Sequence, residues 1–182
     1  MPFEIETDTL RIRPWREATD RPAFCAMTAD PVMMRYMSDG IPWSDAMNDE
    51  FFARQQRTLD AAGVCMGALV WKETDEVIGV AGLQPLGTTG NLEVGWWVQR
   101  VHQGKGLATA AGAAMVRYAF ETLDQPCVKA ITLPGNQASR RVMEKLGMRY
   151  EGVVTGRQLG HRLPEIEVVL YGIERTGGHT AV

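Results

Sequence analysis

A glycine-rich junction between an apolar strand and an alanine-rich helix constrains the fold of this sequence most. The run from Leu92 to Val98 is typical of a strand, and a helix-forming run begins at Leu107. Between them, Gly104 and Gly106 flank a lysine. A helix start presents unpaired backbone N–H groups and the positive end of the helix dipole, and glycine lets the backbone approach an anion closely. The junction therefore predicts a pyrophosphate-binding loop, with a tight turn that binds nothing as the alternative.

Two common nucleotide-binding loops fit this junction poorly. A nucleoside triphosphate loop reads G-x-x-x-x-G-K-[ST], whereas Lys105 is followed here by Gly106, which has no hydroxyl for magnesium. A dinucleotide loop reads G-x-G-x-x-G/A, and Thr109 occupies its third position here. Its acidic partner would be Asp124, which lies in a turn-like segment rather than at a strand end.

Length and composition are those of an ordinary globular protein. The 182 residues predict a single domain over 1–182, with its core over about 8–174 and a frayed tail over 175–182. Apolar residues make up 45% of the chain and charged residues 23%, and the net charge is −3. The absence of a long basic run argues against nucleic-acid binding. No apolar run approaches the ~20 residues of a membrane span, and the acidic N-terminal segment does not resemble a signal peptide.

The cysteines and histidines give no sign of a metal or redox site. Cys25, Cys65 and Cys127 lie far apart and form no C-x-x-C pair. The histidines likewise lack ligand-like spacing. We therefore expect a protein that holds no metal. Because an odd number of cysteines fits a reducing compartment, we also expect a cytoplasmic protein.

Hydrophobic periodicity and turn signals predict the order of the elements. Strands are expected over residues 9–14, 64–71, 77–84, 92–99, 128–133, 148–156 and 165–173. Helices are expected over residues 19–27, 44–62, 106–123 and 136–147. This order predicts an α+β fold, in which a mixed, mostly antiparallel central sheet of about seven strands is flanked by about four helices.

Three segments together resemble one family. Gln103-x-x-Gly106-x-Ala108 is similar to the Q/R-x-x-G-x-G/A acetyl-CoA loop of the GCN5-related N-acetyltransferase (GNAT) superfamily. Residues 136–148 resemble its second signature, N-x-x-S-x-x-V-x-E-K-L-G-[FM]. The opening from Thr9 to Trp15 resembles the first strand of the ribosomal-protein-alanine N-acetyltransferase-like (RimJ/RimL-type) branch. The resemblance covers about residues 8–174, and it implies the acyl-CoA N-acyltransferase fold with acetyl-CoA as co-substrate.

The resemblance also implies which residues hold acetyl-CoA. The backbone of the glycine loop would bind the pyrophosphate, and the amide of Asn136 would hold the pantetheine arm. The full set comprises Trp97, Val98, Gln103, Gly104, Lys105, Gly106, Leu107, Ala108, Thr109 and Asn136. For Lys105 the alternative is a solvated cation, for Thr109 an ordinary helix-surface residue, and for Asn136 a helix N-cap, which is compatible with binding.

Glu93 is the candidate general base. An amine attacks a thioester only in its neutral form, and in this superfamily an acidic residue on the strand before the loop often removes the amine proton. Glu93 lies on that strand and shares a pleat face with Gly95 and Trp97. Apolar neighbours would raise its pKa towards the working range. The alternative is a surface glutamate on a half-exposed strand.

Ser139 is the candidate acid that protonates the leaving thiolate. By resemblance it lies near the coenzyme sulfur, one helical turn after Asn136. Many members of the superfamily use a tyrosine near this helix, but residues 136–148 contain none. The alternatives are therefore protonation by solvent and a Ser139 that only packs on the sheet. Related sequences often carry an acceptor-side aspartate shortly before the last strand. In this chain, Glu165 and Glu167 are the candidates to replace it.

The sequence accordingly predicts an N-acetyltransferase that transfers the acetyl group directly to a primary amine. The amine would belong to a peptide N-terminus or to a small molecule. Two alternatives stay open, a non-catalytic acyl-CoA-binding domain and a transferase of a larger acyl group such as succinyl. The net charge of −3 favours cationic acceptors only slightly. The sequence does not specify the oligomeric state, and a homodimer is one of the options.

Overall fold

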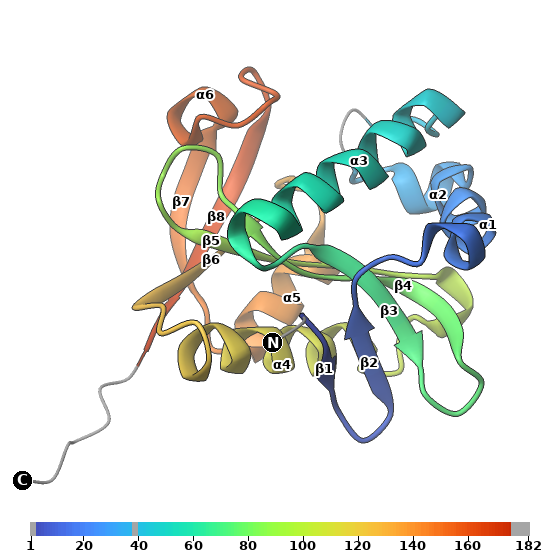
Figure 1. Cartoon of the computed structure of the whole chain (residues 1–182). Coiled ribbons are helices and arrows are strands. Elements are labelled where there is room, and N and C mark those ends of the chain that lie inside the picture. Colours follow the sequence, from blue (N-terminus) through green and yellow to red (C-terminus); the bar gives the residue numbers. More distant parts are fainter. Residues whose placement is uncertain (1–2, 38–39, 176–182) are drawn as a thin grey trace, which may run out of the picture.

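The computed structural model describes residues 3–37 and 40–175 (Figure 1). From residue 176 onward, the predicted frayed tail lies outside the described residues. The strands are β1 (Ile5–Glu6), β2 (Leu10–Arg13), β3 (Met66–Trp71), β4 (Glu76–Pro85), β5 (Leu92–Val98), β6 (Cys127–Thr132), β7 (Arg149–Thr155) and β8 (Glu167–Glu174). The helices are α1 (Glu17–Thr28), α2 (Pro31–Met34), α3 (Asp45–Ala62), the 3₁₀-helix η1 (Arg100–His102), α4 (Leu107–Glu121), α5 (Gln137–Lys145) and α6 (Gly156–Leu159).

All of these strands form one sheet in the order β1-β2-β3-β4-β5-β6-β8-β7. Every neighbouring pair is antiparallel except β5 and β6, which are parallel and are connected through α4. That parallel pairing covers only Leu92 with Val128 and Glu93 with Lys129. Beyond Glu93 the two strands therefore separate, and the sheet is split from that point onward.

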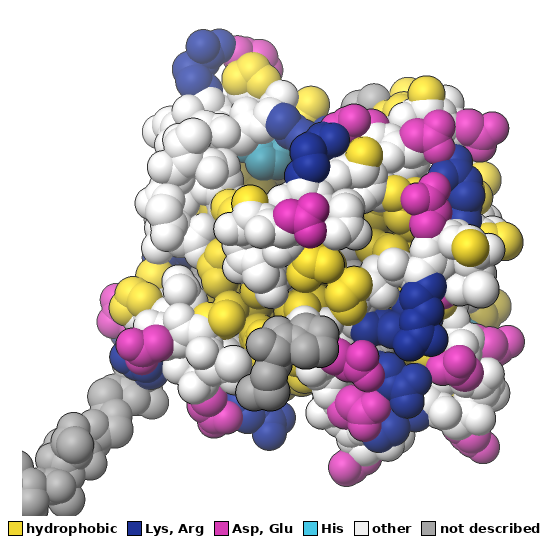
Figure 2. Space-filling view, viewed as in Figure 1, with side chains coloured by type: hydrophobic (Ala, Val, Ile, Leu, Met, Phe, Trp, Pro, Cys, Tyr) yellow, Lys and Arg dark blue, Asp and Glu magenta, His cyan; other side chains and the backbone are white. Residues whose placement is uncertain are grey.

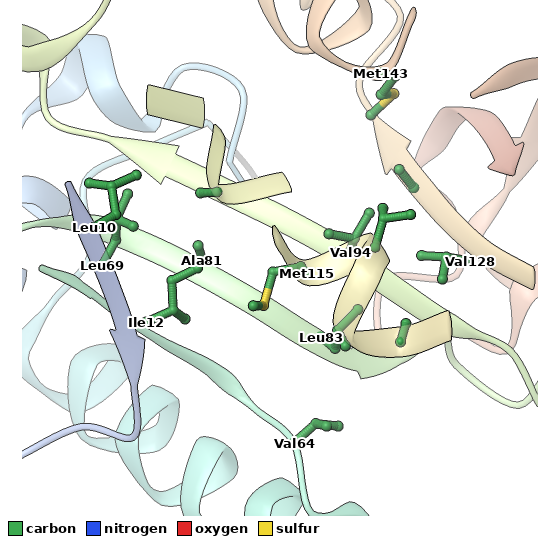
Figure 3. Packing of buried hydrophobic residues seen from close by; sticks show 14 of the residues in the cluster. Leu10, Ile12, Val64, Leu69, Ala81, Leu83, Val94, Met115, Val128 and Met143 are labelled. Atoms are coloured by element: carbon green, nitrogen blue, oxygen red, sulfur yellow. The ribbon is translucent and has the colours of Figure 1, made fainter. Parts of the chain in front are cut away.

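Helices cover both faces of the sheet. Helices α4 and α5 lie on one face, and α1 and α3 lie on the other (Figure 1). On the α4 face, Met115 of α4 and Met143 of α5 belong to one buried cluster with strand residues such as Leu83 and Val94 (Figure 3). Each fully buried side chain of this size stabilises the fold by about 1.5–3 kcal/mol. None of the described helices has the length and apolar character needed to cross a membrane.

The predicted α+β fold and its mixed sheet are confirmed, with differences in the short elements. The described residues form eight strands rather than about seven, because β1 adds a two-residue strand at the edge. Helices α2 and α6 span four residues each, which is too short for a period-3.6 pattern to reveal. The helices expected over residues 44–62 and 136–147 are present as α3 and α5. Ser44 Oγ caps α3, and Gly147 follows α5 with a φ of +80°.

The start of the first helix is the clearest departure from expectation. It begins at Glu17 rather than near Thr19 or Asp20, and no side chain caps it. The Asp20 carboxylate instead accepts hydrogen bonds from the Arg13 guanidinium at 2.7 and 3.1 Å and from the Arg16 N–H at 2.7 Å. Both side chains of the ion pair are 4% exposed, so α1 is tied to β2 by a buried charge pair.

Candidate active site

A cavity of about 370 Å³ occupies the split between β5 and β6. Its walls are β5 from Glu93 onward, the end of β6, the start of α5, one face of α3 and the loop after α6. The divergence of two parallel strands therefore creates this space. Side chains from both strands and from both helical layers reach it.

Glu93 lies at the apex of the split, where the last β5–β6 pair forms. It lines the cavity with only 8% of its surface exposed. Burial raises its pKa to about 7, against the opposing effects of a hydrogen bond from Gln84 and the charge of Arg162. The Gln84 Nε2 group donates to Glu93 Oε2 at 3.0 Å across the β4–β5 pair. A carboxyl group with a pKa near 7 is suited to accept a proton at neutral pH.

Trp97 shares the pleat face of Glu93, as the alternation along the strand predicts. Its ring packs against Phe24 and Phe51 at 6.1 and 5.8 Å and meets Trp43 edge-on at 5.6 Å. These aromatic rings belong to the α1–α3 side of the core, and Trp43 and Phe51 also line the cavity. Trp97 thus joins the core to the wall of the cavity.

Asn136 and Ser139 line the cavity from the start of α5. Asn136 Oδ1 accepts from the Ser139 N–H at 3.2 Å, which makes it the N-cap of α5, and its Nδ2 donates to Thr132 Oγ1 at 3.0 Å. The Ser139 hydroxyl makes no hydrogen bond to any other described residue. The structure therefore brings Ser139 and Glu93 into one cavity and leaves the serine hydroxyl available.

The loop of residues 103–109 lies at the other end of β5. Gly104 and Gly106 adopt left-handed conformations with φ of +76° and +80°, which glycine adopts without strain. No side chain caps α4, and within residues 3–37 and 40–175 the N–H groups of residues 104–109 have no hydrogen-bond acceptor. Several free donors thus converge at the positive end of the α4 dipole.

Two side chains fix the loop to the sheet, one at the end of β5 and one at the end of β3. Gln103 Nε2 donates to the Val98 carbonyl at 2.8 Å. The Lys105 ammonium lies over the Trp71 ring, 5.4 Å from its centroid. This contact directs Lys105 to a neighbouring aromatic face and accounts for its position without a phosphate. Val98, Gln103 and the rest of the loop do not line the cavity of Glu93.

Several residues of the cavity were not singled out in the sequence as candidates. Gln84 becomes a partner of Glu93 only through the β4–β5 register, which the sequence pattern does not specify. Arg54 from α3, with His161 and Arg162 from the loop after α6, lines the same cavity. Because these residues lie far apart in the sequence and belong to no motif, nothing in the sequence indicated that they share a cavity.

The carboxylates suggested as acceptor-side substitutes are not in the cavity. Glu165 forms an exposed ion pair with Arg157, and Glu167 is exposed at the start of β8. Tyr150 and Tyr171 both lie next to α5, through Arg140. Tyr171 is buried and its hydroxyl accepts from Arg140 Nε at 3.1 Å, whereas Tyr150 is exposed. Tyr36 reaches the cavity from the segment after α2.

Comparison with known proteins gives a consistent picture. A family model described as "Acetyltransferase (GNAT) domain" matches residues 9–149. The Bacillus subtilis (strain 168) "Uncharacterized protein YkkB" is 30% identical over 153 residues, which are 83% of this chain and 88% of that protein. The Bacillus licheniformis "Uncharacterized N-acetyltransferase p20" is 29% identical over 152 residues, covering 82% of this chain and 84% of that one.

Solved structures share the fold along nearly the whole chain. The acetyltransferase from Agrobacterium tumefaciens str. C58 superposes with a TM-score of 0.78 at 26% identity, covering 94% of each chain. RimL, a ribosomal L7/L12 alpha-N-protein acetyltransferase solved with coenzyme A, gives a TM-score of 0.76 at 16% identity, covering 94% of this chain and 97% of that one. At that identity the likeness to RimL concerns the fold alone.

Proposed function

The chain belongs to the GNAT acetyltransferase family, and from this premise we propose that it transfers the acetyl group of acetyl-CoA directly to a primary amine. The amine belongs to a small molecule or to a protein N-terminus. The observation that carries the proposal is Glu93, a buried carboxyl group with a pKa of about 7 in a cavity that it shares with Ser139.

The loop of residues 103–109 binds the pyrophosphate of acetyl-CoA in this proposal. Its free N–H groups and the α4 dipole match the acceptor oxygens and the negative charge of a diphosphate. The open space at Gly104 and Gly106, where an added Cβ atom would meet no protein atom within 4 Å, is where the phosphates approach the backbone. Thr109 in the first turn of α4 supplies a hydroxyl to the same oxygens.

The pantetheine arm follows the free edge of β5 from the loop to Glu93. A rise of ~3.3 Å per residue separates Val98 from Glu93 by roughly 17 Å, so an extended arm is needed to connect the two ends. The Val98 carbonyl points away from β4, because it accepts from Gln103. The alternation of strand backbone then directs the N–H and C=O groups of Val94 and Trp96 to the same open side. Asn136 contacts the arm from the opposite wall.

Transfer proceeds in one displacement. Glu93 takes a proton from the ammonium form of the acceptor, and the neutral nitrogen attacks the thioester carbonyl. The new C–N bond forms, the C–S bond breaks, and the nitrogen releases its second proton to water. The thiolate takes a proton from water or from Ser139, which water then reprotonates. Backbone N–H groups on the open side of β5 stabilise the oxyanion. This sequence needs no acyl-enzyme.

A direct assay tests the proposal. Purified protein is mixed with acetyl-CoA and a panel of peptides, amino acids, polyamines and aminoglycosides, and free thiol release is measured. Amine-dependent release supports the proposed reaction. Release only with succinyl-CoA would replace it with transfer of a larger acyl group. Coenzyme binding by calorimetry without any release would favour a binding-only domain.

A further inference from the structure

Two arginines line the cavity on the side of α3 and of the loop after α6. Helix α3 presents Phe51, Arg54 and Thr58 along one side, as residues spaced three and four apart do. Arg162 reaches the same cavity from the loop between α6 and β8. In Figure 2, basic side chains and a histidine come together between α3 and α6.

The Arg54 guanidinium is held in place without a counterion. It lies over the Phe51 ring, 5.6 Å from its centroid, and it forms no ion pair with any other described residue. Burial lowers its pKa, and the nearby charge of Arg162 lowers it further. Glu50 lies close enough to act in the opposite direction, but its carboxylate is paired with Arg57 at 2.7 Å.

Arg162 and His161 are positioned by a well-anchored loop. The His161 N–H donates to the Gly156 carbonyl at 2.8 Å, and the Leu163 N–H donates to His161 Nδ1 at 3.2 Å. Burial, together with the charges of Arg162 and Arg54, lowers the pKa of His161 and favours the neutral ring. A neutral ring whose Nδ1 accepts carries its proton on Nε2, so His161 is a further donor. Arg162 is exposed at the rim of the cavity and makes no ion pair within the described part of the chain, so it is free to reach a ligand.

The charges in this cavity are therefore unbalanced. Among the described residues that line it, Glu93 is the one carboxylate, against Arg54 and Arg162. At a pH near its pKa of about 7, Glu93 supplies only part of one negative charge. Two guanidiniums without partners at the end of a cavity are a site for a carboxylate, which guanidinium groups bind through charge-assisted hydrogen bonds.

We propose that Arg54 and Arg162, assisted by His161, bind a carboxylate of the acceptor, so that the substrates are amines with a carboxylate close to the amino group. This inference rests on the proposed function and narrows its acceptor. A free α-amino acid and a peptide with an acidic residue next to its N-terminus both carry this group. Polyamines and aminoglycosides are excluded by repulsion. The net charge of −3 suggests the opposite, but nearby charges in a cavity outweigh distant ones.

Matched acceptors test the inference. Thiol release from acetyl-CoA is measured with methionine and methioninamide, and with peptides beginning Met-Asp and Met-Asn. The carboxylate member of at least one pair is expected to have a kcat/KM roughly ten- to hundredfold higher, the usual loss when a charge-assisted hydrogen bond is removed. Preference for methionine over methioninamide identifies a free amino acid as the acceptor. Preference for the Met-Asp peptide over the Met-Asn peptide identifies an acidic peptide as the acceptor.

Variants assign the effect to the arginines. Arg54→Gln and Arg162→Gln should each abolish most of this preference, chiefly through KM for the acceptor, and leave KM for acetyl-CoA unchanged. Arg117→Gln is the control, because Arg117 is an exposed arginine of α4 that does not line the cavity and has no ion pair among the described residues. Equal rates for acid and amide, or a loss in Arg117→Gln as large as in Arg54→Gln, would overturn the inference while leaving the acetyltransferase reaction intact.

A binding measurement keeps the two proposals separate. If no acceptor supports thiol release, the proposed function fails, and the carboxylate site is then tested by titrating N-acetylmethionine and its amide into protein saturated with coenzyme A. Tighter binding of the acid, lost in Arg54→Gln, supports the site. Equal or absent binding of the two compounds overturns it.

Discussion

Gln84 Nε2 donates a hydrogen bond to Glu93 Oε2 at 3.0 Å, at the point where β5 and β6 separate. The bond fixes one carboxylate oxygen from a neighbouring strand. It leaves the other oxygen to meet whatever enters the cavity. The orientation of the candidate base is thus set by strand register rather than by a neighbour in the sequence.

Glu93→Gln should remove the base and keep an oxygen that accepts from Gln84. We expect turnover to fall roughly 10²- to 10⁴-fold, with the affinity for acetyl-CoA by calorimetry unchanged. Because the pKa of Glu93 is raised to about 7, the wild-type rate should rise as the pH increases through about 7. The pH dependence of the rate in the variant should then reflect only the titration of the acceptor amine. Full activity in the variant would exclude Glu93 as the base.

The same burial should make the stability of the protein depend on pH. The pKa of Glu93 rises from an ordinary value of 4.5 to about 7 on folding. Between these values the folded state binds more protons than the unfolded state, so the free energy of unfolding falls as the pH rises. The contribution is fully present below 4.5 and is lost above about 7, amounting to at most about 3 kcal/mol. Urea unfolding at pH 5 and pH 8 should show this loss in wild type but not in Glu93→Gln. The same pH dependence in both proteins would contradict the expectation.

Gly106→Val should abolish coenzyme binding, because a branched side chain would occupy the space in front of the free N–H groups of the loop. The left-handed conformation should also cost about 1–2 kcal/mol of stability. Gly63→Val is the matched control. Gly63 also has a positive φ, +69°, and similarly open surroundings, but it ends α3 and does not belong to the loop of residues 103–109. Calorimetry should show lost acetyl-CoA binding in the first variant alone. Unchanged affinity in Gly106→Val would disprove the loop assignment.

Ser139→Ala should slow turnover by roughly 10²-fold if the serine protonates the leaving thiolate. Its stability should match wild type, because the hydroxyl has no partner within the described residues and the Asn136 cap uses the backbone N–H. Asn136→Ala is the contrasting variant, and loss of the cap should cost it about 0.5–2 kcal/mol. Steady-state kinetics and thermal unfolding distinguish the two. Wild-type turnover in Ser139→Ala would assign the proton to solvent.

Asp20→Ala should be the most damaging of these substitutions to stability. It leaves the buried Arg13 guanidinium without its counterion, at an expected cost of about 3–5 kcal/mol. The effect should be separate from catalysis, since neither residue lines the cavity. Denaturant unfolding provides the measurement. A loss below about 1 kcal/mol would show that water reaches the guanidinium when the aspartate is absent.

Much of the fold was predictable from local pattern. The helices expected over residues 44–62 and 136–147 match α3 and α5 to within two residues, and Glu93 and Trp97 share a face of β5 as expected, because turn chemistry and strand periodicity are local properties. The start of α1 was not predicted correctly, because Asp20, near the expected start, is held by Arg13 of the neighbouring strand β2. The very short elements β1, α2 and α6 contain too few residues for a periodic signal.

The residues of the candidate site fall into the same two groups, those marked by local sequence and those brought together by tertiary structure. Glu93, Ser139 and the glycine loop could be singled out because motifs and neighbouring strands mark them. Gln84, Arg54 and Arg162 could not, because what brings them to Glu93 is sheet register and the packing of α3 and the loop after α6. The residues proposed for the reaction are therefore marked by local sequence, whereas the side chains proposed to surround the acceptor are brought together by the tertiary structure.

The brief pairing of β5 with β6 has a mechanical consequence. Only Leu92 with Val128 and Glu93 with Lys129 join two half-sheets through strand hydrogen bonds, so cohesion across this seam depends largely on the helices that bridge it. A ligand lying along β5 would act as a replaceable extra strand and close the seam. Amide hydrogen exchange along Val94–Val98 would then slow on coenzyme binding, because the ligand would supply the hydrogen bonds that β6 does not make to this part of β5.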